Sequence, residues 1–171
     1  MLQRRYVLRL LGAAPLLLMV GCEREKSTLN LRVGDSLPAL QLPKLDGSQF
    51  SFSAYSDSPV LLNFWATWCL PCRAEMAGLE SAHKYFASGG LKIFGISVDS
   101  DVFLVKEFVF KEDITFPILL DPNGERSRAD FRVQAFPTSY LVDRSGRIAD
   151  LWVGEVNWDA SSVRKRIEQV L

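Results

Sequence analysis

The feature that most restricts the fold of this chain is a Cys-x-x-Cys pair at the junction of a strand and a helix. The preceding run Val60–Ala66 is almost continuously apolar, as is typical of a short strand buried on both faces. Residues 70–88 then carry apolar side chains at helical spacing, and Gly89 begins the break that ends the helix. Cys69 and Cys72 therefore lie where a buried strand turns into a helix.

This position has a chemical consequence for the two thiols. A helix N-terminus has free N–H groups and a partial positive charge, which stabilise a thiolate at Cys69 and lower its pKa. Cys72 follows one turn later on the same face, within reach for a disulfide and more buried. Pro71 lies in the first turn, where a missing N–H costs little. The pattern predicts a redox-active pair with Cys69 as the attacking sulfur.

Other uses of a Cys-x-x-Cys pair fit the sequence less well. Structural zinc needs about four ligands, and the chain has only one further cysteine and one histidine, His83. Covalent haem attachment needs a histidine after the second cysteine, where Arg73 stands. A purely structural disulfide across so short a loop would stabilise little. We therefore expect no metal site.

The rest of the mature chain alternates strand and helix patterns. Further strands are predicted at 91–98, 116–120, 138–142 and 149–153, with a weaker one at 47–53. Helices are predicted at 102–111, 126–131 and 158–171, and the turn around Gly146 joins the last two strands as a hairpin. This order predicts an α/β fold with one mixed sheet between helices.

The N-terminus is typical of an export segment. Residues 1–21 hold three arginines, no acid and an apolar stretch too short for a membrane span of about 20 residues. The stretch ends at Gly21-Cys22, which resembles a bacterial lipobox. An uncleaved signal anchor and plain secretion are the alternatives to lipidation. The segment around Arg4-Arg5 also partly resembles a twin-arginine signal. We expect a signal peptide at 1–21, a lipidated Cys22, a polar tether at 22–33 and one domain at 34–171.

Composition excludes several classes of function. The 171 residues carry 20 basic and 20 acidic side chains, and loss of residues 1–21 would leave 17 basic against 20 acidic. A mildly acidic domain is unsuited to binding nucleic acid through a basic surface. Hydrophobic residues make up 48% of the chain, which is ordinary for a globular protein.

The segment Asn63–Glu75, with Trp68-Cys69-Leu70-Pro71-Cys72 at its centre, resembles the active-site segment of thioredoxin-like thiol–disulfide oxidoreductases, specifically the membrane-tethered TlpA/ResA branch. Phe136-Pro137-Thr138 resembles the cis-proline loop of that fold. Residues 33–52 resemble the N-terminal β extension of the branch, and residues 101–131 resemble its central strand–helix insert. The resemblance implies a thioredoxin-like fold with a central mixed sheet flanked by helices.

The resemblance also implies roles for individual residues. Cys69 would be the nucleophile and Cys72 the resolving thiol, while Pro137 would be cis, with flanking backbone that pairs with a substrate strand. Asn63 stands where many thioredoxins bury an acid, so a proton relay would pass to Asp99 or Asp101, which could equally be a helix cap and its neighbour. Glu75 matches the branch motif and is another candidate for the relay, although an exposed glutamate in the first helical turn is the simpler interpretation.

The expected function is reduction of disulfides in exported proteins, with apocytochrome c as the substrate type that the resemblance implies. A membrane thiol transporter would supply electrons, the redox-active disulfide would be the only cofactor, and the protein would act as a lipid-anchored monomer on the periplasmic side. Leu70 and Phe136 would shape substrate choice. A copper metallochaperone and a thiol peroxidase are the alternatives. The first lacks a histidine after His83, and the second lacks a threonine three residues before Cys69, where Ala66 stands.

Overall fold

The structure is a computed structural model that describes residues 31–171. The predicted signal segment, Cys22 and residues 23–30 of the predicted tether lie outside the described residues. Between residues 31 and 171, no helix is both long enough and apolar enough to cross a membrane.

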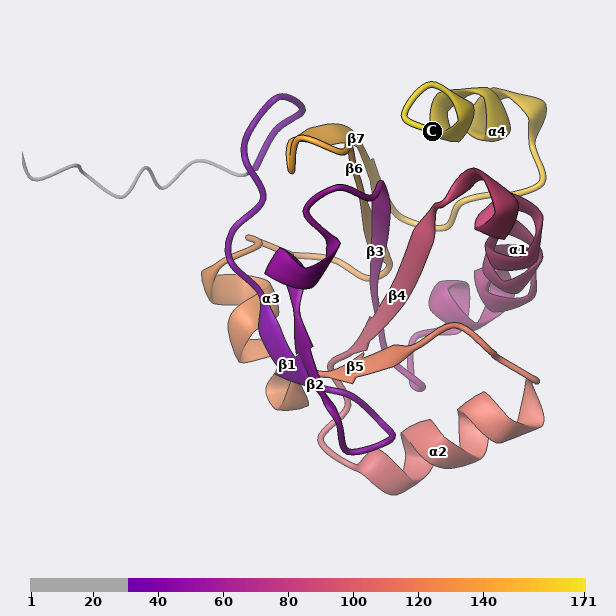
Figure 1. Cartoon of the computed structure of the whole chain (residues 1–171). Helices are drawn as coiled ribbons and strands as arrows, with labels where there is room; N and C mark the ends of the chain where they lie inside the picture. The colour runs from indigo at the N-terminus through magenta and orange to yellow at the C-terminus, as the bar shows by residue number, and fades with distance from the viewer. Residues whose placement is uncertain (1–30) are drawn as a thin grey trace, which may run out of the picture.

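A five-stranded mixed sheet forms the centre of the domain (Figure 1). Its strand order is β5-β4-β3-β6-β7, in which β3, β4 and β5 are parallel and β6 and β7 run antiparallel to their neighbours. The strands are β3 (Val60–Trp65), β4 (Lys92–Ser97), β5 (Ile118–Leu120), β6 (Thr138–Val142) and β7 (Ile148–Val153). Every residue of the central strand β3 is buried, which explains its unbroken apolar run and confirms the predicted mixed sheet.

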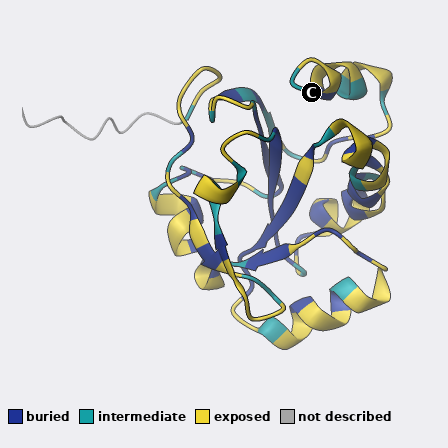
Figure 2. Ribbon diagram, viewed as in Figure 1, coloured by how far each residue is buried: buried dark blue, intermediate teal, exposed yellow. Residues whose placement is uncertain are grey.

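Helices cover both faces of this sheet. They are α1 (Leu70–Phe86), α2 (Val102–Lys111), α3 (Glu125–Ala129) and α4 (Ser161–Glu168), with 3-10 turns at Phe52–Tyr55, Ala87–Gly89 and Pro122–Gly124. One core cluster joins α1, α2 and α4 to one face of the sheet. A second cluster joins the N-terminal extension and the segment after α3 to the other face. Figure 2 shows the buried strands between helices whose outer surfaces are exposed.

The N-terminal extension is a two-stranded antiparallel sheet of β1 (Gln41–Pro43) and β2 (Gln49–Ser51). The chain before it pairs with the sheet through an antiparallel bridge between Ser36 and Arg147, and the chain after β1 does so through Lys44 and Leu119. The predicted N-terminal β extension is therefore present, and residues 101–131, the predicted central insert, contain α2, β5 and α3.

The predicted closing helix at 158–171 is too long. Helix α4 begins at Ser161, after a turn in which the Ala160 N–H donates to the Asn157 carbonyl at 3.0 Å. Trp158 precedes the helix, is only 1% exposed, and packs its ring against Trp152 at 5.6 Å. Val163 and Ile167, whose spacing predicts this helix, do lie in α4, which ends at Glu168, whereas Trp158 is a buried loop residue before it.

Candidate active site

One edge of the central sheet brings together four segments that are far apart in the sequence. The parallel register of β3 and β4 pairs Trp65 with Ser97, so both strands end at this edge. Strand β6 begins here, because Thr138 pairs with Phe64, and β7 ends here, because Val153 pairs with Thr138. The cysteine pair, the 98–101 loop, the proline loop before β6 and the loop after β7 therefore converge.

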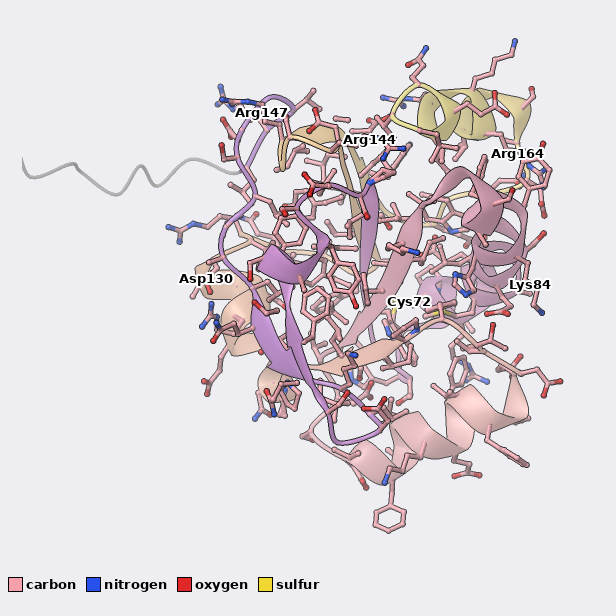
Figure 3. The ribbon with its side chains drawn as sticks, viewed as in Figure 1. Cys72, Lys84, Asp130, Arg144, Arg147 and Arg164 are labelled. Atoms are coloured by element: carbon pink, nitrogen blue, oxygen red, sulfur yellow. A yellow bond between two sulfur atoms is a disulfide. The ribbon has the colours of Figure 1, made fainter. Side chains whose placement is uncertain are left out.

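Cys69 and Cys72 form a disulfide, with an S–S distance of 2.06 Å. Cys69 has extended backbone and is the N-cap residue of α1, and its Sγ accepts the backbone N–H of Cys72 at 3.3 Å. Cys69 is 6% exposed and Cys72, labelled in Figure 3, is fully buried. The order of accessibility and the position of Cys69 at the helix N-terminus agree with the sequence prediction.

Apolar side chains surround the disulfide at the surface. Trp68 is 67% exposed and Leu70 is 75% exposed. The ring of Phe136 meets that of Trp68 edge-on, with their centroids 6.0 Å apart. Pro71 is the second residue of α1, as predicted. Large apolar groups exposed beside a disulfide form a surface that can contact another polypeptide.

The proline loop contacts the cysteine segment through Phe136 and Trp68 and has the predicted backbone geometry. The Phe136–Pro137 peptide bond is cis. The Pro137 carbonyl accepts the N–H of Gly154 at 2.8 Å, and the Thr138 hydroxyl donates to the Ala135 carbonyl at 2.8 Å. The loop is thus fixed to the end of β7 on one side and closed on itself on the other.

Glu75 is a buried residue, which corrects the expectation of an exposed glutamate in the first helical turn. It is 3% exposed and lies beyond the first turn of α1. Its Oε1 accepts the Nδ2 of Asn63 at 2.7 Å, and its Oε2 accepts the N–H of Val156 at 2.7 Å. Burial raises the pKa of Glu75 to about 7, although these two hydrogen bonds oppose the increase, and the Glu155 carboxylate adds to it.

The two aspartates after β4 have different environments. Asp101 is exposed and caps α2, because its Oδ1 accepts the N–H of Phe103 at 2.8 Å. Asp99 is 4% exposed and accepts hydrogen bonds from Thr67 and Ser97. The helix-cap interpretation is therefore confirmed for Asp101 alone, while Asp99 contacts the loop that precedes Cys69.

Sequence reasoning missed several supporting groups. Asn63 donates to Ser139 Oγ at 2.9 Å as well as to Glu75, so the amide links β3, β6 and α1. The spacing of Cys72, Glu75 and Leu79 along α1 is a signal that places Glu75 on the buried face. No comparable signal identifies Thr67 or the backbone of Val156, because both contacts depend on loops that meet only in the folded chain. Among residues 31–171, no three His, Cys, Asp or Glu side chains are grouped as metal ligands.

Comparison with known proteins places this site in a family. The pattern of the AhpC/TSA family matches residues 33–151. The chain is 36% identical over 149 residues to thioredoxin-like protein YneN of Bacillus subtilis, covering 85% of this chain and 82% of that protein. It is 32% identical over 160 residues to the thiol-disulfide oxidoreductase ResA of Oceanobacillus iheyensis, covering 91% and 82%.

Solved structures share the fold. A candidate DsbE thiol:disulfide interchange protein of Chlorobium tepidum superposes with a TM-score of 0.76 at 28% identity, covering 82% of this chain and 99% of that one. The family match over residues 33–151 includes the disulfide and the proline loop described above. The chain belongs to the thioredoxin-like AhpC/TSA family and is a thiol–disulfide oxidoreductase of the ResA and DsbE type.

Proposed function

We propose that the protein reduces disulfides of exported proteins, with Cys69 as the nucleophile and Cys72 as the resolving thiol. The observation that carries this proposal is the asymmetry of the pair. Cys69 caps α1 and is the more accessible sulfur, whereas Cys72 is fully buried behind it. A sulfur at the end of a helix dipole is the better thiolate, and the buried sulfur can then act only within the molecule.

The exchange proceeds in two steps that conserve electrons. The Cys69 thiolate attacks one sulfur of the substrate disulfide, and the other substrate sulfur leaves as a thiolate. The Cys72 thiolate then attacks Cys69 Sγ, which releases the second substrate thiolate and forms the intramolecular disulfide. The substrate gains two electrons and the enzyme loses two, so each turnover requires an external dithiol, which we assign to a membrane thiol transporter.

We assign to Glu75 the proton transfer at Cys72. The Cys72 thiol must lose a proton before it attacks Cys69, inside a site that excludes water. Glu75 lies three residues beyond Cys72 on the same helical face and is held by Asn63 and Val156. Its pKa of about 7 matches the role, because an acid–base group works best when its pKa is close to the ambient pH.

Location and substrate form the finer part of the proposal. The basic and apolar segment 1–21 followed by Cys22 supports export and lipid anchoring on the periplasmic side. The cis-proline loop and the exposed Trp68 support an extended polypeptide as substrate. The similarity to proteins named ResA favours apocytochrome c as the substrate type.

A redox titration tests the direction of transfer. The full-length protein, purified in detergent, is equilibrated in thiol buffers and the fraction of oxidised Cys69–Cys72 pair is measured. We expect a reduction potential below about −200 mV, as for reducing members of the fold. A value near −120 mV, typical of a strong oxidant, would contradict the proposal.

A trapping experiment identifies the substrate. Cys72→Ser should arrest the reaction at the mixed disulfide, so partners remain linked to Cys69 in cells. The matched control carries both Cys69→Ser and Cys72→Ser and should retain none of them. Recovery of the same set of proteins with the double variant would show that the linkage is not made by Cys69.

Two assays separate this function from its rivals. We expect no stoichiometric Cu(I) binding by the reduced protein, because no histidine follows His83 to complete a copper site with the two thiolates. We also expect no turnover of hydrogen peroxide, because Ala66 replaces the threonine that a peroxidase active site places three residues before its cysteine. The peroxide assay is informative because the AhpC/TSA family pattern matches this chain.

A further inference from the structure

The three residues between β3 and α1 determine where Cys69 lies. Trp65 ends β3, and the chain then passes through Ala66, Thr67 and Trp68 before Cys69 caps the helix. One backbone hydrogen bond closes this turn, from the Cys69 N–H to the Ala66 carbonyl at 3.2 Å. Ala66 is fully buried, and Trp68, although 67% exposed, contacts the Phe136 ring. Thr67 adds the side-chain and backbone hydrogen bonds that tie the turn to the segment after β4.

Thr67 is attached to Asp99 at two points. Its N–H donates to Asp99 Oδ2 at 2.9 Å and to Oδ1 at 3.2 Å, and its hydroxyl donates to Oδ1 at 2.6 Å. Because the backbone and the side chain of one residue bind the same carboxylate, both the position and the orientation of this peptide are fixed.

Asp99 is itself held in place. It is 4% exposed, its Oδ2 accepts the Ser97 hydroxyl at 2.8 Å, and its own N–H donates to Ser97 Oγ at 3.2 Å. Asp99 follows β4, the neighbour of β3 in the sheet, so the carboxylate is anchored to the same rigid sheet that carries the cysteine loop. A buried carboxylate with several donors is a strong and specific anchor.

We infer that Asp99 is a positioning residue that holds the Cys69 sulfur at the N-terminus of α1 by clamping Thr67. This inference rests on the proposed function of Cys69 as the nucleophile. Within residues 31–171, the hydrogen bonds of Asp99 go to Thr67 and Ser97 and not to either cysteine. Its effect on the thiol therefore passes through the turn, and this role replaces that of a proton relay.

The clamp matters because the stabilisation of a thiolate by a helix N-terminus decreases within one turn. In the structure Cys69 Sγ accepts the Cys72 N–H at 3.3 Å. Release of Thr67 would let the turn move and lengthen this contact. The thiolate would then lose helix-terminus stabilisation of about 0.3–1 kcal/mol, equivalent to a rise of about 0.2–0.7 pH unit in the Cys69 titration midpoint.

The test is the pH dependence of Cys69 alkylation by iodoacetamide. The reduced full-length protein carries Cys72→Ser throughout, and mass spectrometry quantifies the Cys69 peptide, so Cys22 does not contribute. Thr67→Val removes the hydroxyl donor, whereas Thr67→Ser retains it. We expect Thr67→Val to raise the midpoint by about 0.2–0.7 unit, with about 1.5- to 5-fold slower alkylation below it, and Thr67→Ser to leave it unchanged.

Further variants separate positioning from stability and from charge. Ser97→Ala weakens the anchoring of Asp99 away from the turn, so it controls for general loss of stability and should shift the midpoint less than Thr67→Val.

Asp99→Asn removes a buried negative charge, so a lowered midpoint would mean that the charge acts directly through space and would overturn the clamp. A wild-type midpoint in Thr67→Val would overturn it as well. Alkylation of Cys69 does not require disulfide exchange. Failure of the clamp is therefore distinguishable from failure of the proposed disulfide reduction.

Discussion

At the scale of single residues, the pair Asn63 and Glu75 defines the chemistry beneath the disulfide. Asn63 is fully buried at the centre of β3 and uses its amide N–H groups as donors to Glu75 and Ser139. An aspartate at this position could not donate these bonds and would place a second negative charge beside Glu75. The asparagine therefore leaves Glu75 as the single titratable group of this buried pair.

We predict that Glu75 makes the stability of the protein depend on pH. Its pKa rises from 4.5 in the unfolded chain to about 7 in the folded protein, chiefly because of burial. The folded state therefore binds more protons between these values, and stability is complete below about pH 4.5 and decreases as the pH rises towards 7. The loss is about 3 kcal/mol across this range. Urea denaturation of the oxidised protein at pH 4.5–8 measures it.

Two variants make this prediction specific. Glu75→Gln should abolish the decline over this range, because the amide does not titrate. Glu155→Gln removes the neighbouring negative charge, so the decline should finish at a lower pH. An unchanged decline in Glu75→Gln would assign the titration to another group.

The residue scale also shows what sequence could predict. The roles expected of the two cysteines follow from strand and helix signals that are local in the chain, and the structure places both residues accordingly. The burial of Glu75 depends on the loop after β7, whose Val156 N–H reaches its carboxylate from a position 81 residues away. Helical spacing identifies the face of α1 on which Glu75 lies, but the chain segment that covers this face is known only from the fold.

At the scale of elements, α1 is an uninterrupted helix that needs a small residue at its midpoint. The helix runs from Leu70 to Phe86 without a break at Ala77-Gly78. Gly78 faces Trp158, whose ring lies against this face of the helix. The same contact explains why α4 begins later than predicted, since Trp158 packs on α1 as a loop residue before the helix.

We predict that Gly78→Ala stabilises the protein by about 0.5–1 kcal/mol, the difference in helix propensity between the two residues. A Cβ at this position would lie 3.5 Å from Trp158, an ordinary van der Waals contact. Thermal or urea denaturation measures the change, with near-UV circular dichroism as a check that Trp158 has not moved.

Gly95→Ala in β4 is the contrasting control. A Cβ there would lie 2.9 Å from Ile118 Cδ1 and 3.0 Å from both Phe116 Cε2 and Trp65 Nε1. Overpacking of this kind costs about 1–3 kcal/mol. If both alanine variants destabilised the protein equally, the contact at Gly78 would be tighter than the structure has it.

At the scale of the whole molecule, the N-terminal extension is part of one core. The ring of Phe50 in β2 meets that of Phe94 in β4 at 4.6 Å, and Tyr55 meets Phe94 at 5.0 Å. Leu40 is 1% exposed and belongs to the same cluster as the buried residues of β3 and β4. The alternating pattern of residues 47–53 suggests a half-exposed strand, and only the folded sheet shows what its inner side covers.

We predict from this packing that the extension and the sheet unfold as one unit. Leu40→Ala should cost about 2–5 kcal/mol, as for any fully buried leucine, although Leu40 lies before the first strand of the central sheet. Val33→Ala is the matched control, because Val33 is 60% exposed and its truncation should change stability by less than about 0.5 kcal/mol. Urea unfolding followed by both tryptophan fluorescence and far-UV circular dichroism should give one coincident transition in each variant. A separate early transition in Leu40→Ala, with the tryptophan signal unaffected, would instead mean that the extension docks on a sheet that is stable without it.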